Sequence, residues 1–287
     1  MRLLFLETTR ETYPLFVKVL VYANVYIAFC AASQVLFTQR VAGIPFSWDS
    51  VSYMFFILLS TFVQYNVQRG YIIAREHNGT ERSQWVLRHR KTLLIIILLA
   101  LIILLALCNN LSWTAIGVMA GAEVVSTFYY MPPFNLRRYG YVKPFLLGMV
   151  WMISCGFVPF LEAKKLNEAA WFFLASQFCF VSALGVLFDV KDAVSDFANG
   201  TRTYANTFGT SSAKLIAAVL IVLSAGLFHL AALPAHVKYT NDGLMLVSLI
   251  MAAITNDHRR SVFYYLFIDG LMLIQGLLIP VVLYMSR

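Results

Sequence analysis

Three of the chain's 14 acidic residues stand close together, at Asp189, Asp192 and Asp196. On a helix, residues three, four and seven positions apart share one face, so these three predict an acidic face two turns long. Like charges stacked in this way repel, and a divalent cation among them would relieve the repulsion. Mg²⁺ is commonly held by one or two carboxylates together with substrate phosphates. The alternative is a solvated helix end in which Lys191 relieves the repulsion.

The residues that follow are suited to a phosphate group. Gly200 provides a flexible turn, Thr201 and Thr203 provide hydroxyls, and Arg202 provides a fixed positive charge. The Arg guanidinium matches the geometry of phosphate oxygens, and small neighbouring residues allow a close approach. A metal ion held by the carboxylates and the charge of Arg202 beside it would together bind a diphosphate.

The elements that position these residues are expected to lie in a membrane. Of the 287 residues, 60% are hydrophobic and 13% are charged, whereas soluble domains have about 45–50% apolar and about a quarter charged residues. Long apolar runs predict nine transmembrane helices, which leave no room for a large soluble domain. Residues 1–287 are therefore expected to form a single transmembrane domain. The predicted spans are Pro14–Phe37, Val51–Arg69, Thr92–Leu107, Leu111–Tyr130, Lys143–Leu161, Ala169–Phe188, Ala213–Leu233, Gly243–Ile254 and Ser261–Tyr284.

The distribution of basic residues gives this bundle an orientation. With nine spans, 17 of the 22 Lys and Arg residues fall on the side of the N-terminus and of the two longest loops. Because Lys and Arg of short loops collect on the cytoplasmic side, the N-terminus and both long loops are expected in the cytoplasm. The basic residues of these loops account for the net charge of +8. Their positive charge is favourable beside anionic lipid headgroups, so nucleic acid is not implied as a partner.

Two further acidic residues, Glu123 and Asp269, fall inside predicted spans. Charges at such depth are costly, and each is therefore a candidate functional residue. Glu123 precedes Tyr130 by two helical turns on the same face, which could place it in a cavity beside an acceptor. A structural polar contact is the alternative for Glu123, and it is the favoured interpretation for Asp269. A transporter would also use such residues, but it needs paired broken helices or an internal repeat, and neither is clear in this sequence.

The acidic run resembles a motif of a known family. The sequence from Asp189 to Thr203 is similar to the second aspartate-rich motif of the UbiA superfamily of intramembrane prenyltransferases, D-x-x-D-x-x-x-D followed by a Gly and an R-T pair. The segment from Tyr129 to Arg138 is similar to the end of helix 4 in those enzymes. The first motif of the family, N-D-x-x-D-x-x-x-D-R, corresponds to 66–75. Asn66 and Arg75 match it, but every aspartate is missing.

The resemblance implies an all-α integral membrane protein with the nine-helix UbiA-type prenyltransferase fold. It implies transfer of an isoprenyl group from an isoprenyl diphosphate to an apolar or aromatic acceptor, with Mg²⁺ assistance. Asp189, Asp192 and Asp196 would hold Mg²⁺, and Asn66 would contribute an amide oxygen or a hydrogen bond. The expected contacts to substrates are Arg69, Arg75, Tyr130, Arg137, Arg138, Lys143, Lys191, Arg202 and Glu123.

The missing aspartates leave alternatives open. Val67, Gly70 and Ala74 stand at the aspartate positions, so one of two metals would lose its carboxylate ligands. Arg69 and Arg75 offer fixed positive charge in its place. The chain could otherwise be a catalytically inactive or repurposed isoprenoid-binding membrane protein of the same fold. At single sites, Lys143 and the Arg137–Arg138 pair are alternatively lipid-facing anchors, and Tyr130 belongs alternatively to an interfacial aromatic belt.

Overall fold

The computed structural model describes residues 13–76, 80–131, 133, 134 and 136–285, except for the side chains of Arg75, Glu76 and Arg137. Within these ranges the regular structure is helical and no strand occurs. The α-helices are α1 (Leu15–Tyr22), α2 (Val25–Val41), α3 (Trp48–Glu76), α4 (Glu81–Arg88), α5 (Arg90–Leu107), α6 (Trp113–Tyr130), α7 (Lys143–Trp151), α8 (Val158–Glu162), α9 (Glu168–Ala198), α10 (Tyr204–Phe208), α11 (Thr210–Leu230), α12 (Ala235–Ile254) and α13 (Asp269–Met285). Short 3₁₀ segments are η1 (Cys108–Asn110) and η2 (Leu136–Arg138), and π-helical segments are η3 (Met152–Phe157) and η4 (Phe263–Ile268).

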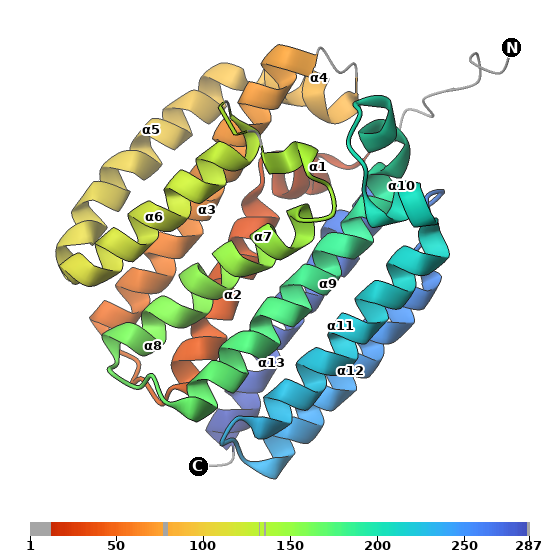
Figure 1. Cartoon of the computed structure of the whole chain (residues 1–287). Coiled ribbons are helices and arrows are strands. Elements are labelled where there is room, and N and C mark those ends of the chain that lie inside the picture. The colour runs from red at the N-terminus through yellow and green to blue at the C-terminus, as the bar shows by residue number, and fades with distance from the viewer. Residues whose placement is uncertain (1–12, 77–79, 132, 135, 286–287) are drawn as a thin grey trace, which may run out of the picture.

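The long helices lie side by side in one bundle with α9 at its centre (Figure 1). Helix α9 packs against α7 on one side and α11 on the other, and α2 packs against α3 and α13. In the most apolar stretch of α9, 72% of the residues are buried, compared with 17% in α5. The apolar side chains of α9 are therefore buried at the centre of the bundle, whereas most of the apolar side chains of α5 face outwards.

Part of the predicted topology needs correction. Within the described part of the chain, seven helical segments are long and apolar enough to cross a membrane, or eight if α1 and α2 form one span bent by 59°. The predicted fourth span corresponds to α6, which is not among these segments. Its Glu123, small residues and terminal aromatic residues lower its mean hydropathy. An all-helical membrane-type fold is therefore supported, and the number of nine spans remains a prediction.

The helices extend beyond the apolar runs that predicted them. Helix α9 continues for ten residues past Phe188 and so carries all three aspartates, as their spacing predicted. Helix α3 continues to Glu76, and the long loop that was predicted after it contains the amphipathic helix α4. The predicted eighth span, Gly243–Ile254, is the second half of the longer helix α12. The predicted limits were set by hydropathy alone. The polar residues at the helix ends were therefore left outside the predicted helices.

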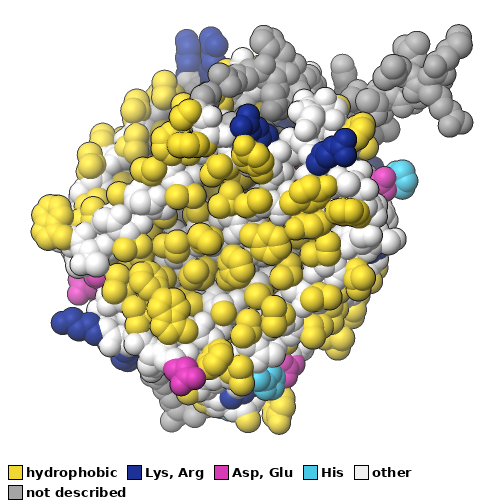
Figure 2. All heavy atoms as spheres, in the orientation of Figure 1, with side chains coloured by type: hydrophobic (Ala, Val, Ile, Leu, Met, Phe, Trp, Pro, Cys, Tyr) yellow, Lys and Arg dark blue, Asp and Glu magenta, His cyan; other side chains and the backbone are white. Residues whose placement is uncertain are grey.

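The surface supports a membrane location for the bundle. Hydrophobic side chains cover the middle of the face shown in Figure 2, and charged side chains lie mainly towards its two ends. Many of the exposed large hydrophobic residues belong to α5, among them Leu98 at 51%, Ile102 at 64% and Leu105 at 72% exposure. Exposed apolar surface on this scale is unfavourable in water and favourable in contact with lipid chains.

Candidate functional site

An ion-pair network lies where the end of α9 meets the start of α7. Lys143 is the first residue of α7, and its Nζ atom lies 2.6 Å from Asp189 Oδ1 and 3.1 Å from Asp196 Oδ2. The side chain of Asp189 is fully buried and that of Asp196 is 4% exposed. Burying two carboxylates is costly unless a positive charge accompanies them, and Lys143 supplies that charge.

Close packing of α7 on α9 brings these residues together. At Gly148 an added Cβ would overlap Ser182 Oγ and would lie 2.9 Å from the backbone oxygen of Phe178. At Gly185 an added Cβ would lie 3.1 Å from the Cβ of Pro144. Pro144 follows Lys143 directly, and Gly185 is one turn before Asp189. The absence of side chains at these glycines therefore permits the approach that places Lys143 against Asp189.

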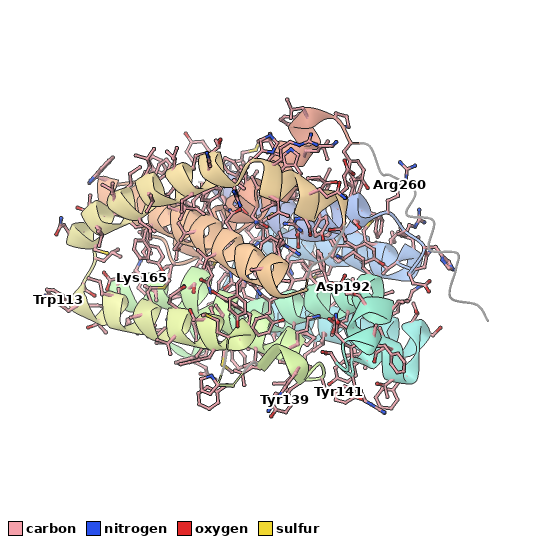
Figure 3. All side chains as sticks on the ribbon, turned by 90° about the horizontal axis from the view of Figure 1, so that it is seen from above. Trp113, Tyr139, Tyr141, Lys165, Asp192 and Arg260 are labelled. Atoms are coloured by element: carbon pink, nitrogen blue, oxygen red, sulfur yellow. The ribbon has the colours of Figure 1, made fainter. Side chains whose placement is uncertain are left out.

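The second lysine of the site neutralises the remaining aspartate. Lys191 Nζ lies 2.9 Å from Asp192 Oδ1 and donates a hydrogen bond of 3.0 Å to the Tyr265 hydroxyl. Tyr265 lies in the π-helical segment η4, and π-helical turns are frequent at functional sites. The Asp192 side chain is 38% exposed, so this part of the network is open to solvent. In Figure 3 Asp192 lies at the same end of the bundle as Tyr141 and Arg260, opposite to Trp113 and Lys165.

Two arginines complete the positive charge of the site. The Arg82 guanidinium lies 4.8 Å from the centre of the Tyr265 ring, and its Nη2 donates to Val21 O and Asn24 Oδ1. Arg69 lies close enough for its charge to act on both Asp192 and Tyr265. Arg69 was predicted at this site. Arg82 was not among the predicted contacts, and its contacts with α1, with Asn24 and with η4 add it to the site.

Asn66 has a structural role that the sequence did not indicate. Its Nδ2 donates to the backbone oxygens of Ala23 and Phe62, and its Oδ1 accepts from Asn24 Nδ2. Asn24 joins α1 to α2 in the left-handed region, with φ of 58°, a conformation that Asn tolerates better than most residues. Asn66 therefore holds the break between α1 and α2, and its predicted contact with substrate or metal would compete with these bonds.

The remaining predicted residues lie in different surroundings. Tyr130 is buried and packs edge-on against Tyr71 at 5.5 Å, which agrees with a position inside the bundle. Glu123 is exposed, so the predicted cavity position beside Tyr130 is not what the structure shows. Arg202 is exposed, and Arg138 is exposed and contacts the neighbouring Tyr139. The side chains of Arg75 and Arg137 lie outside the described residues.

Asp269 lines an enclosed cavity between the helices. The cavity measures about 30 Å³ and is lined also by Tyr65 and Trp151, together with apolar residues. A volume of this size holds roughly one or two water molecules, so an isoprenyl tail would enter only if side chains moved apart. The cavity nevertheless places a carboxylate and two aromatic residues below the ion-pair network. The sequence favoured a structural role for Asp269. The structure places Asp269 on the wall of this cavity.

A Mg²⁺ ion does not fit the side chains as they stand. Among the described residues no group of three acidic, His or Cys side chains is placed to hold a metal ion. The ammonium of Lys143 stands between Asp189 and Asp196, where a shared cation would have to lie. Asp192 instead pairs with Lys191. Two lysines divide the three carboxylates in this structure, and the sharing of one Mg²⁺ ion by them remains a prediction.

Comparison with solved structures decides the fold. An apo structure of a UbiA homologue from Aeropyrum pernix K1 superposes with a TM-score of 0.67 and 11% identity, over 91% of this chain and 98% of that chain. This chain has the UbiA fold. A UbiA homologue from Archaeoglobus fulgidus bound to GPP and Mg²⁺ gives a TM-score of 0.65 and 14% identity, over 92% of this chain and 99% of that one.

A third structure with the UbiA fold belongs to a study of digeranylgeranylglyceryl phosphate synthase in membranes. It gives a TM-score of 0.62 and 14% identity, over 93% of this chain and 97% of that one. Neither family models nor curated proteins give a match to the sequence. The resemblance predicted from the acidic run is therefore confirmed through the fold, while the low identities leave the chemistry to be argued from this chain's own residues.

Proposed function

We propose that this chain is a membrane-embedded prenyltransferase. It binds an isoprenyl diphosphate with the diphosphate at the Asp192 end of the bundle and transfers the isoprenyl group to an apolar or aromatic acceptor. The observation that carries the proposal is the cluster of Lys143, Lys191, Arg69 and Arg82 at the polar end of an apolar bundle of this fold. An amphiphilic substrate with an anionic head and a hydrocarbon tail matches such a site.

The charges of the cluster favour an anion. Two lysines and two arginines face three aspartates, which leaves one positive charge in excess before any ligand binds. The Lys143 and Lys191 side chains are 16% and 13% exposed, so both are largely withdrawn from water. Withdrawal from water strengthens their attraction for phosphate oxygens, because solvent screening is reduced.

The reaction needs charge stabilisation more than acid–base chemistry. The allylic C–O bond breaks with its electron pair passing to the diphosphate, and the allylic carbon forms a new bond to the acceptor, which then loses a proton. Fixed positive groups stabilise the departing diphosphate as its charge develops. The ring faces of the aromatic residues on the cavity wall, Tyr65 and Trp151, suit a transient carbocation and keep water from it.

Magnesium assistance is the part of the predicted activity that this chain supports least. In this proposal the lysines and arginines perform the binding and the charge stabilisation themselves. A UbiA homologue from Archaeoglobus fulgidus was solved with GPP and Mg²⁺.

A second candidate function is isoprenoid binding without catalysis. It is favoured by the lack of any acidic residue from Asn66 to Arg75, where the resemblance calls for aspartates. A chain of this kind would retain affinity for isoprenyl diphosphates and would leave them intact.

The two candidates are separated by turnover. The purified full-length chain in lipid nanodiscs is incubated with geranylgeranyl diphosphate and a panel of hydroquinone and naphthol acceptors, and released pyrophosphate and prenylated product are measured. We expect both to appear in equal amounts. Binding without release would favour the non-catalytic function, and a lack of binding would contradict both.

A further inference from the structure

We propose that the ammonium of Lys143 takes the place of a bridging metal ion, so that this chain binds a diphosphate without a divalent cation. The inference deepens the proposed function and rests on it for the identity of the ligand head. It starts from the disagreement between the Mg²⁺ expected from the resemblance and the side chains of the described residues.

The geometry of Lys143 is that of a built-in cation. Its Nζ atom lies within 3.1 Å of carboxylate oxygens on Asp189 and Asp196, which are two helical turns apart on α9. A bridging cation would have to occupy the same space between these two side chains. Because Lys143 is the first residue of α7 and is held by the α7–α9 contact, it is fixed there by the fold.

The lysines keep donors for a ligand after satisfying their aspartates. An ammonium has three N–H donors. Lys143 donates a hydrogen bond to Asp196, and its Nζ atom contacts Asp189, whose carboxylate oxygens accept no hydrogen bond in the described part of the chain. Lys191 donates a hydrogen bond to Tyr265 and pairs with Asp192. At least one donor remains on each lysine, and the buried Nε of Arg82 has no hydrogen-bond partner among the described residues. These three cationic groups therefore keep donors for phosphate oxygens.

The sequence of α3 from Asn66 to Arg75 agrees with this arrangement. With aspartates in both motifs, the region would be strongly negative and would bind a diphosphate only through cations. Here α3 carries Arg69 and no acidic residue between Asn66 and Arg75. The region is consequently positive without added ions. The absence of aspartates from 66–75 on α3 and the neutralisation of those on α9 by lysine have the same electrostatic effect.

The test measures diphosphate binding with and without metal. The full-length chain in detergent is treated with EDTA and titrated calorimetrically with inorganic pyrophosphate and with geranyl diphosphate. We expect each Kd in EDTA to lie within about twofold of its value in excess MgCl₂, a difference of under 0.5 kcal/mol at roughly 1.4 kcal/mol per tenfold. We also expect no stoichiometric Mn²⁺ binding by electron paramagnetic resonance. Stoichiometric Mn²⁺ binding, or pyrophosphate binding that requires Mg²⁺, would overturn the inference.

Variants of Lys143 identify the residue responsible. Lys143→Met should weaken pyrophosphate binding in EDTA by about tenfold or more, since hydrogen bonds to charged groups contribute about 1.5–3 kcal/mol. Added Mg²⁺ should restore much of that loss through the freed carboxylates. Lys143→Arg should retain metal-free binding. The matched control is Lys214→Met, which removes the same charge one turn into α11 and should bind as the parent does.

Loss of Lys143 leaves a buried carboxylate without a partner, which is strongly destabilising. If Lys143→Met does not fold, the double variant Lys143→Met with Asp189→Asn removes the unpaired charge and should show the same loss of metal-free binding. If either Met variant binds pyrophosphate in EDTA as tightly as the parent does, the inference is overturned.

The outcome is distinguishable from failure of the proposed function. Metal-free pyrophosphate binding without any prenyl transfer would contradict the transferase activity and leave the role of Lys143 intact. Prenyl transfer that stops in EDTA would contradict the role of Lys143 and leave the activity intact.

Discussion

The side chain of Asn66 shows how one residue can match a motif and yet have a different use. Its amide bonds to Ala23 and Asn24, at the break between α1 and α2, and to the backbone oxygen of Phe62, one turn earlier in α3. Arg82, which lies over the Tyr265 ring, bonds to the same Asn24. At this scale Asn66 positions Arg82 through Asn24, and its expected contact with substrate or metal remains a prediction.

Replacement of Asn66 by Ala should therefore act mainly on stability. It leaves Asn24 Nδ2 and the Ala23 carbonyl without the partner that Asn66 provides, which costs about 1–3 kcal/mol. We expect a lower thermal unfolding midpoint in detergent, and Asn109→Ala, at an exposed position in η1, serves as the control. An unchanged midpoint with lost pyrophosphate affinity would instead show that Asn66 contacts the ligand.

At the scale of elements, local patterns could be predicted and contacts between helices could not. The spacing of Asp189, Asp192 and Asp196 is a property of one helix, and the prediction that they share a helix is confirmed. Lys143 and Asp189 are 46 residues apart in the chain and lie on two different helices. Their pairing depends on how these helices pack, and hydropathy carries no information about that. Tyr265 was missed for the same reason. The break at Asn24 lies within a continuous apolar run, so only Asn24 itself could have indicated it.

The contact between α7 and α9 predicts an effect of volume at Gly148. Ala at this position would overlap Ser182 Oγ and approach the Phe178 carbonyl, so the helices must separate or the site must shift. Overpacking of this kind costs about 1–3 kcal/mol. We expect Gly148→Ala to lower the unfolding midpoint and to weaken pyrophosphate binding together. Gly226→Ala on α11, where an added Cβ has no neighbour within 4 Å, is the control.

An unchanged Kd for pyrophosphate in Gly148→Ala would show that the spacing of α7 and α9 does not set the position of Lys143. A change of equal size in Gly226→Ala would show that any glycine substitution in these helices has the effect. The comparison therefore tests the contact itself and not the propensity of Ala to form a helix.

At the scale of the whole molecule, both ends of the chain build the same core. Gln34 on α2 donates 2.8 Å to the backbone oxygen of Met272 on α13, and a Cβ at Gly276 would collide with Ser33. Gln275 on α13 donates in turn to Asn241 on α12. Because early and late helices pack on each other in this way, we propose that residues 1–287 form a single transmembrane domain.

The orientation of this domain in the membrane is a prediction from charge. The predicted topology gives 17 of 22 basic residues to the side of the Asp192 end, and basic loops are retained in the cytoplasm. Trp113 and Arg260 lie at opposite ends of the bundle in Figure 3, and both are exposed. We expect an impermeant maleimide added to intact cells to label Trp113→Cys, and to label Arg260→Cys only after permeabilisation. Cys108, the one native cysteine that is not buried, is replaced by Ser in both variants. Labelling of Arg260→Cys in intact cells would place the diphosphate site outside, where a cytoplasmic isoprenyl diphosphate cannot reach it, and would contradict the proposed function together with the orientation.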